Sequence, residues 1–252
     1  MDYYRDACWY MKTIHVLPGE DEDVYLEFEG VSLCCEVYAN GVFVARHTGG
    51  FSTFRVYLTP YIRRGKVKIA VMADNRDHAD VYPRTADFTF YGGIYRNVKL
   101  IVVPKRHFDL DYYGNQGFYV KPVLNDDGTA TVTLKAYCTG TTIIDTVRFL
   151  VDGEVKEVSH RNAEAVFRLE KPHLWDGRND PFLYTAEAQL VSAGVVIDRV
   201  SARFGVRSFR VDPQKGFFLN GKPYALHGVA RHQDRENMGW AITEKEQKED
   251  ME

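Results

Sequence analysis

The sequence predicts an all-β protein of 252 residues. β-Branched and aromatic residues recur in short runs, and aromatic residues alone make up 13% of the chain. Such a composition favours strands over helices. Turn-forming pairs separate the runs. Through the middle of the chain the runs recur about every 8–12 residues, which is the spacing of a β-sandwich.

The first strands are predicted between residues 24 and 104. Along residues 24–37, apolar and polar side chains alternate with the period of two that a half-buried strand requires. Asn40-Gly41 then separates two apolar runs, and because this pair readily adopts positive φ values we expect a hairpin with a type I′ turn. Two more strands follow from the alternations Val67, Ile69, Val71 and Ile94, Val98, Leu100, Val102, the second of which is closed by Pro104.

A second block of strands is predicted over residues 106–210. Turn pairs at Asp127-Gly128, Asp152-Gly153 and Ala193-Gly194 separate alternating runs. This pattern predicts an immunoglobulin-like sandwich. The sequence lacks the Cys…Trp…Cys spacing of antibody domains, so a true antibody-type domain is not expected.

The last residues, 211–252, begin a third block. Asn220-Gly221 predicts another hairpin, and a strand is expected from Tyr224 onward. Thr243 can cap a helix, and Glu246 can complete a capping box three residues later. A lone helix of about ten residues is marginal in water. We therefore expect that the sequence contains the start of a unit that it does not complete.

Composition and charge argue against several classes of protein. The formal net charge of -3 is unsuited to a nucleic-acid surface. No stretch reaches the roughly 18 apolar residues of a membrane span, and Met1–Tyr10 lacks the apolar segment of a secretory signal. The cysteines show no metal-ligand spacing and are interpreted as reduced thiols of a cytoplasmic protein; they are Cys8, Cys34, Cys35 and Cys138.

Several segments carry a resemblance to a known family. They are EGVSLCCEVYANGVFVARHTGGFSTFRVYLTPYI, ADFTFYGGIYRNVKLI, LWDGRNDPFLYTAEAQL with FGVRSF, and FLNGKPYALHGVARHQDRENMGWAITEKEQKEDM. In this order they resemble the N-terminal portion of glycoside hydrolase family 2, the group of β-galactosidases, β-glucuronidases and β-mannosidases. YPRTADFTFYGGIYRNV and RHQDRENMGWAIT look most like β-galactosidases.

The resemblance implies three domains. A jelly-roll sugar-binding β-sandwich is expected over residues 1–105, with an early strand of the family lacking a counterpart here. An immunoglobulin-like β-sandwich follows over residues 106–210. Residues 211–252 would be the first strand, loop and helix of a truncated (β/α)8 barrel, and the chain is expected to be cut short at both ends.

The resemblance also implies an activity for the complete protein, the retaining hydrolysis of terminal β-galactosides. The family uses one glutamate as general acid/base and another as nucleophile, both on barrel strands. A barrel needs about 250 residues, so both catalytic glutamates are absent and this chain alone is expected to be inactive. No cofactor is required, although a sodium or magnesium ion is compatible with the family. The expected partner is a carbohydrate, with a homo-oligomer as a further expectation and neither nucleic acid nor membrane.

Three residues are carried over as substrate-binding candidates. By itself an aspartate before an aromatic run is more often a turn residue, but Asp87 matches the family's jelly-roll aspartate that contacts sugar hydroxyls and can ligate sodium. His232 matches the histidine that helps to hold the sugar in the transition state. Trp240 is a candidate stacking platform, while Trp175 is expected in the sandwich core. Arg231 is expected to pair with a carboxylate of the missing barrel.

A second class of function stays open. The chain could be a non-catalytic carbohydrate- or protein-binding module made of two β-sandwiches. A binding module has no need of the strand, polar loop and helix cap in residues 215–252, so their presence favours the hydrolase. Residues 224–229 and the helix from Thr243 are expected to be the least protected from hydrogen exchange, since their packing partners are absent.

Overall fold

The computed structural model describes residues 4–79, 81–83 and 85–252. The first three residues of the N-terminal segment, residue 80, and the Arg84 of the YPRTADF motif lie outside this range. The chain divides into two compact units, one made of Met1–Val103 with Ala230–Glu252 and the other of Pro104–Val229.

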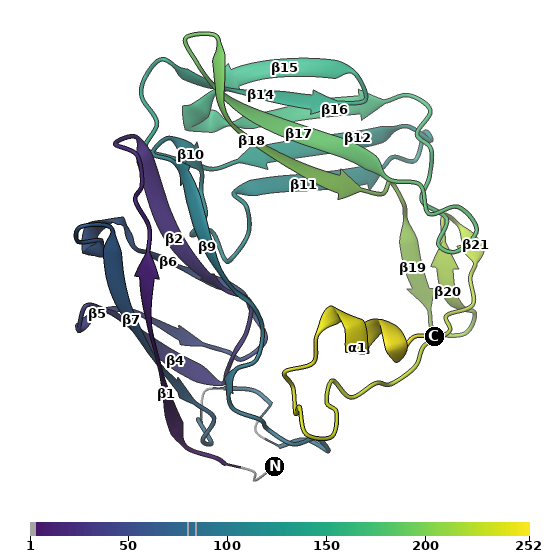
Figure 1. The fold of residues 1–252 in the computed structure, drawn as a ribbon. Helices are drawn as coiled ribbons and strands as arrows, with labels where there is room; N and C mark the ends of the chain where they lie inside the picture. Colours follow the sequence, from purple (N-terminus) through teal and green to yellow (C-terminus); the bar gives the residue numbers. More distant parts are fainter. Residues whose placement is uncertain (1–3, 80, 84) are drawn as a thin grey trace. The chain divides into compact units, whose positions relative to one another are not determined.

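The first unit is a β-sandwich with two principal sheets (Figure 1). One sheet has the strand order β1-β7-β4-β5, the other has the order β6-β2-β9, and β3 pairs with β8. The elements are β1 (Ala7–His15), β2 (Glu22–Phe28), β3 (Val31–Ser32), β4 (Cys34–Ala39), β5 (Val42–Thr48), β6 (Phe54–Tyr57), the 3-10 helix η1 (Thr59–Tyr61), β7 (Lys66–Asp74), β8 (Gly93–Ile94) and β9 (Val98–Pro104).

The core of this sandwich contains the apolar residues that alternate in the sequence. Val24, Leu26 and Phe28 of β2 are buried against residues of β4 and β7, and Phe28 stacks on Phe54 with a centroid separation of 4.9 Å. The predicted hairpin at Asn40-Gly41 is confirmed, because both residues have positive φ angles, 51° and 83°. This turn joins β4 to β5 and thereby fixes their register.

One side of the sandwich exposes apolar surface. Val98, Leu100 and Val102 keep the predicted alternation, yet they are 42%, 38% and 43% exposed. Their strand, β9, stands at the end of its sheet, as β1 does in the other. An apolar groove of 330 Å³ runs beside these two strands, and the core residues Leu26 and Phe28 are part of its lining.

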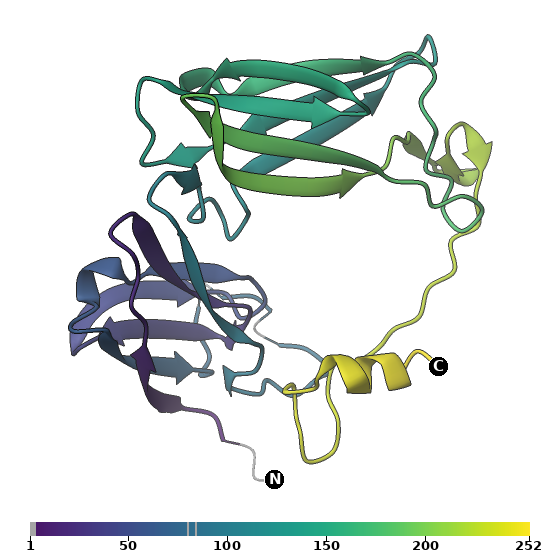
Figure 2. The same cartoon turned by 45° about the horizontal axis from the view of Figure 1, so that its top comes forward.

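The second unit contains another β-sandwich, whose two main sheets lie face to face (Figure 2). Their strand orders are β11-β12-β16 and β15-β14-β17-β18, and β10 pairs with β13. The elements are β10 (His107–Phe108), β11 (Phe118–Leu124), β12 (Ala130–Ala136), β13 (Cys138–Thr139), β14 (Asp145–Val151), β15 (Glu154–Ser159), the 3-10 helix η2 (His160–Asn162), β16 (Glu164–Leu169), β17 (Tyr184–Ser192) and β18 (Val195–Phe204).

The hairpins predicted for the second sandwich are confirmed. Asp152-Gly153 joins β14 to β15 and Ala193-Gly194 joins β17 to β18, each pair with positive φ angles. Phe149 and Phe167 fill the core between the sheets and are fully buried, which contributes about 1.5–3 kcal/mol for each ring. The prediction that Trp175 lies in this core is wrong, because its half-buried ring lies under the Arg207 guanidinium at 4.7 Å.

The prediction for residues 211–252 is confirmed in part. A small sheet forms from β19 (Phe209–Asp212), β20 (Gly216–Leu219) and β21 (Lys222–Pro223), with the expected turn at Asn220-Gly221. The strand expected from Tyr224 onward is absent, since residues 224–232 form no regular element. A parallel barrel strand is stabilised by its neighbours. Among the described residues no strand pairs with this segment beyond the Tyr224 amide, which donates to the Phe217 carbonyl oxygen at 3.0 Å. No part of a barrel is therefore formed within the described residues.

The predicted helix is confirmed as α1 (Glu244–Glu249). Thr243 caps it and Glu246 completes the capping box. Among the described residues, no helix is long and apolar enough to cross a membrane. No disulfide joins the four cysteines, all of which lie among the described residues.

Candidate functional site

The polar turn after residue 230 folds back onto the first sandwich. Arg96, between β8 and β9, bridges the two ends of this turn: Nη1 donates to the carbonyl oxygen of Trp240 at 2.5 Å, and Nη2 donates to Oε1 of Gln233 at 2.7 Å. Guanidinium groups suit such double contacts because their donors are fixed in a planar fork. A single side chain of the sandwich therefore binds both ends of the 233–240 loop.

Trp240 is the hydrophobic anchor of the same loop. Its ring is only 6% exposed and is surrounded by four aromatic rings, those of Phe51, Phe88, Tyr91 and Tyr95, with centroid separations of 5.5, 5.9, 6.1 and 5.4 Å. The predicted stacking of a sugar on Trp240 would require a free ring face. Its placement instead supports an anchoring role.

The structure brings the other two predicted site residues together. Asp87, in the loop before β8, lies with Oδ2 3.9 Å from Nε2 of His232. The Phe88 ring meets the His232 ring edge-on at 6.4 Å. Both polar side chains face solvent, with 88% of the Asp87 side chain and 51% of the His232 side chain exposed. A carboxylate that accepts and an imidazole that can donate or accept thus stand side by side, free to bind hydroxyl groups.

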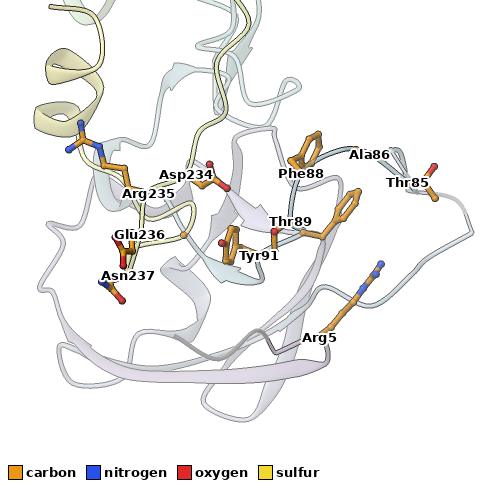
Figure 3. A pocket seen from close by; sticks show the side chains of 12 residues that line it. Arg5, Thr85, Ala86, Phe88, Thr89, Tyr91, Asp234, Arg235, Glu236 and Asn237 are labelled. Atoms are coloured by element: carbon orange, nitrogen blue, oxygen red, sulfur yellow. The ribbon is translucent and has the colours of Figure 1, made fainter.

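Two cavities lie near this pair: His232 lines one, and the neighbours of Asp87 in the chain, Ala86 and Phe88, line the other, while Asp87 itself lines neither. The smaller one has a volume of 180 Å³ and is lined by His232, Phe88, Trp240 and Asp234, among others. The larger one has a volume of 830 Å³ and lies between residues 85–91 and the 234–239 turn (Figure 3). Phe88 and Asp234 line both cavities.

Asp234 is a residue that the sequence analysis missed. It lies in the polar turn that follows His232 and lines both cavities, so the turn composition alone could have drawn attention to it. Its position beside the Asp87 loop depends on the return of the chain from residue 230, which no local pattern predicts.

The expectation for Arg231 is corrected by the structure. Arg231 donates from Nε to the Asp250 carboxylate at 3.0 Å, so its partner lies just after α1 and within this chain. Arg235 also binds Asp250, at 2.5 Å, and Glu249, at 2.7 Å. The hydrogen bonds from Arg235 and then Arg231 hold the pKa of Asp250 below its usual range. These exposed ion pairs fix α1 against the turn.

A metal at Asp87 is tested by the donor set around it. Sodium and magnesium prefer several oxygen ligands. In the described part of the chain no group of three or more His, Cys, Asp and Glu side chains could hold a metal ion. The nearest ionisable partner of Asp87 is an imidazole. A sodium or magnesium ion at Asp87 stays a prediction, and no chemical step is derived through one.

Comparisons with known proteins agree with this architecture. A family model described as "Glycosyl hydrolases family 2, sugar binding domain" matches residues 2–104. A second model, "Glycosyl hydrolases family 2", matches residues 116–207. The two matches correspond to the two sandwiches.

Individual relatives match the chain over nearly its whole length. It is 33% identical to a β-glucuronidase of Bacteroides fragilis, covering 100% of this chain and 38% of that protein. It is 30% identical to a β-galactosidase of Thermoanaerobacter pseudethanolicus, covering 98% of this chain and 34% of that protein. The relatives therefore carry both names.

Solved structures give the same result. An FMN-binding β-glucuronidase from Facaelibacterium prausnitzii L2-6 superposes with a TM-score of 0.90 and 36% identity, over 99% of this chain and 40% of that one. A Bacteroides uniformis β-glucuronidase gives a TM-score of 0.83 and 30% identity, over 99% and 32%.

The chain spans about a third of the length of the curated relatives it matches, 38% of the Bacteroides fragilis β-glucuronidase and 34% of the Thermoanaerobacter pseudethanolicus β-galactosidase. The matches cover 100% and 99% of this chain, so they extend over both sandwiches and the residues after 230. With two models of one family matched in order, the chain belongs to glycoside hydrolase family 2.

Proposed function

We propose that the complete protein is a retaining glycosidase that removes a terminal β-linked sugar, and that this chain supplies one wall of its sugar-binding site. The observation that carries the proposal is the pairing of Asp87 with His232, at 3.9 Å and open to solvent. Neighbouring hydroxyls of a pyranose ring need adjacent acceptors and donors of this kind. The catalytic pair of carboxyls would come from the barrel that the family resemblance implies.

The chemistry of the wall supports a neutral sugar. Asp87 and Asp234 both lie beside His232, and carboxylates attract hydroxyl donors while repelling an anionic group. Two arginines that line these cavities with Asp234, Arg231 and Arg235, are paired with Asp250 and Glu249. A β-galactoside therefore fits this wall, whereas a β-glucuronide would have to turn its carboxylate toward the rest of the site.

Asp87 and His232 have separate tasks in this proposal. The Asp87 carboxylate accepts hydrogen bonds from sugar hydroxyls and so fixes the orientation of the ring. The His232 imidazole donates or accepts one hydrogen bond beside it. Catalysis profits from such contacts when they strengthen as the ring approaches the transition state. No residue of this chain is assigned as acid, base or nucleophile.

The test uses the purified chain and titrates it with methyl β-galactoside and methyl β-glucuronide by NMR. We expect methyl β-galactoside to shift the resonances of His232 and of the Trp240 indole. We expect Asp87→Asn to weaken this binding by about tenfold, the effect of losing roughly 1.4 kcal/mol of charge-assisted hydrogen bonding. Asp21→Asn is the matched control, because Asp21 is exposed and remote in sequence from Asp87; this variant should bind the sugar as the wild type does.

Each outcome decides part of the proposal. Absence of binding, or equal binding by Asp87→Asn, would overturn the sugar-binding wall. Tighter binding of methyl β-glucuronide would overturn the galactoside assignment but would still support sugar binding at Asp87 and His232. Turnover of a chromogenic β-galactoside by this chain, with host enzymes excluded, would contradict the assignment of the catalytic carboxyls to a barrel.

A further inference from the structure

The outer face of the β1-β7-β4-β5 sheet is largely apolar. The four strands pair so that their outward side chains form rows across the sheet (Figure 1). Two adjacent rows make up most of this outer face: Trp9, Met72, Glu36 and Arg46 in one, and Met11, Ala70, Tyr38 and Phe43 in the other. The residues that alternate with them, such as Val37 and Val71, are buried in the core. Only Glu36 and Arg46 carry a charge in the two rows.

The largest apolar side chains of the outer face are open to solvent. Trp9, Met11 and Phe43 are 56%, 69% and 52% exposed. Scattered exposed apolar residues are ordinary, but a contiguous group of them marks an interaction site. Aromatic residues, methionine and arginine are the residue types that protein–protein interfaces favour. The composition of the outer face therefore indicates a protein partner.

The orientation of the rings argues against a flat chain of sugars as the occupant. The rings of Trp9 and Tyr38 are tilted by 43° at a centroid separation of 5.7 Å. The rings of Tyr38 and Phe43 meet edge-on, at 73° and 5.7 Å. Sugar rings in an extended chain stack best on aromatic faces that share a plane, and these three faces do not. Between Met11 and Tyr38 the row contains only the methyl group of Ala70, so the outer face has the relief that interdigitating side chains require.

Arg46 is free to bind a partner. It lies directly opposite Glu36 in the ladder between β4 and β5, where opposite charges commonly pair. Glu36 instead accepts a hydrogen bond from the Tyr38 hydroxyl at 2.5 Å. Within the described part of the chain, the exposed Arg46 takes part in no hydrogen bond or ion pair. Its guanidinium is suited to stacking on an aromatic ring, and tryptophan is the best of these.

The outer face is complementary to itself. A two-fold axis parallel to the strands, between β7 and β4, lays β1 of one copy over β5 of the other and β7 over β4. Each row then meets the same row of the other copy in reverse order. Arg46 faces Trp9 of the other copy, which gives a cation–π contact. Phe43 faces Met11, a sulfur–aromatic contact, and the large Tyr38 faces the small Ala70.

We propose that the outer face, formed by the two rows, is the interface of a homodimer in which a second copy of this chain lays its β5 over β1. The inference is independent of the proposed function. Four strands about 4.8 Å apart, each about six residues long at about 3.3 Å per residue, make a face of roughly 19 by 20 Å. Each copy thus offers on the order of 400 Å² before side-chain relief, at the low end of specific interfaces. We therefore expect a reversible dimer with a dissociation constant of about 10 μM.

Sedimentation velocity of the purified chain tests the proposal. At about 1 μM the chain should be mainly monomeric and at about 200 μM mainly dimeric, as a dissociation constant near 10 μM requires. A chain that stays monomeric over this range would overturn the proposal, whether the outer face is then bare or serves a different protein.

Two variants test which strands face each other. Met11→Glu and Phe43→Lys each place a charge against an apolar side chain at both symmetry-related contacts, so each should raise the dissociation constant at least tenfold. An equimolar mixture of the two variants should recover the affinity to within about threefold of the wild type. In the mixed dimer one contact joins a carboxylate to an ammonium group, and the other keeps the native pair of Phe43 and Met11. Circular dichroism checks that each variant remains folded.

Leu100→Lys is the control, because Leu100 is a 38% exposed apolar residue on β9 in the other sheet of the same unit. It should leave the dissociation constant unchanged. Loss of the dimer in this variant, with Met11→Glu and Phe43→Lys unaffected, would place the interface at β9 and overturn the proposal. A mixture that fails to recover would overturn the arrangement of β5 over β1. Weakening by both variants with recovery in the mixture would establish it.

Discussion

Replacement of Trp240 by alanine tests whether the polar turn is held to the first sandwich by packing. Trp240 is 6% exposed and contacts four aromatic rings. Truncation of a buried Trp costs about 3–5 kcal/mol. The residue is no member of the main core of the first sandwich, so we expect the loss to open residues 231–250 locally while the strands remain folded.

Hydrogen exchange measured by mass spectrometry follows this opening peptide by peptide. A local loss of about 3 kcal/mol raises the open population by about a hundredfold, since 1.4 kcal/mol corresponds to tenfold. Peptides that contain the Gly239 amide, bonded to the Arg235 carbonyl at 3.0 Å, should therefore exchange about a hundredfold faster, or reach the unprotected rate. Peptides of β4 and β7 should keep the exchange rates of the wild type.

The control is Trp9→Ala, because Trp9 lies on β1 with 56% of its surface exposed. This variant should leave the exchange of residues 231–250 unchanged. Unchanged exchange in the Trp240 variant would refute the anchoring role. Simultaneous loss of protection in β4 and β7 would refute the independence of the turn from the sandwich core.

Three further predictions concern single groups. Arg235 helps to hold the pKa of Asp250 below its usual range. The ionised carboxylate therefore stabilises the attachment of α1 above about pH 4, and this stabilisation is lost as pH falls through the lowered pKa. Arg235→Ala should move the loss to higher pH, as measured by hydrogen exchange across a pH series. Burial raises the pKa of the Cys35 thiol to about 12, so Cys35 in the folded protein should resist iodoacetamide at pH 8, and rapid alkylation seen by mass spectrometry would contradict its burial. The stability of the folded state should also fall above about pH 8.5, because the thiol of the unfolded chain ionises first. Arg96→Gln removes both hydrogen bonds to the 233–240 loop and should weaken methyl β-galactoside binding by about tenfold. Arg96→Lys should restore the affinity only in part, because an ammonium group lacks the planar fork of donors. Full affinity in the Gln variant would contradict a role of Arg96 in holding the loop.

Local chemistry made much of the fold predictable. Asn40-Gly41 and Asn220-Gly221 determine their own turns, because only residues that tolerate positive φ fit both central positions. The helix at Thr243 was likewise predictable, since its capping box involves residues three apart. The barrel strand expected from Tyr224 was wrong because such a strand depends on distant neighbours, which its own sequence does not specify.

The candidate site likewise contains residues that could be predicted and residues that could not. Asp87 and His232 were identified through the family resemblance, and the structure places them 3.9 Å apart. Their participation in catalysis and sugar binding stays a prediction. Asp234 escaped notice, and Trp240 was expected to present a ring face. Both depend on how the chain returns to the first sandwich, a long-range contact that composition and periodicity do not encode.

The different roles of residues 234–236 have a consequence for how this protein can change over evolutionary time. All three line the larger cavity, but only Arg235 also serves attachment, through Glu249 and Asp250. A substitution at Asp234 or Glu236 can therefore alter what is recognised and leave the attachment intact. Selection could explore new ligands at these two positions one mutation at a time, without first acquiring compensating changes elsewhere.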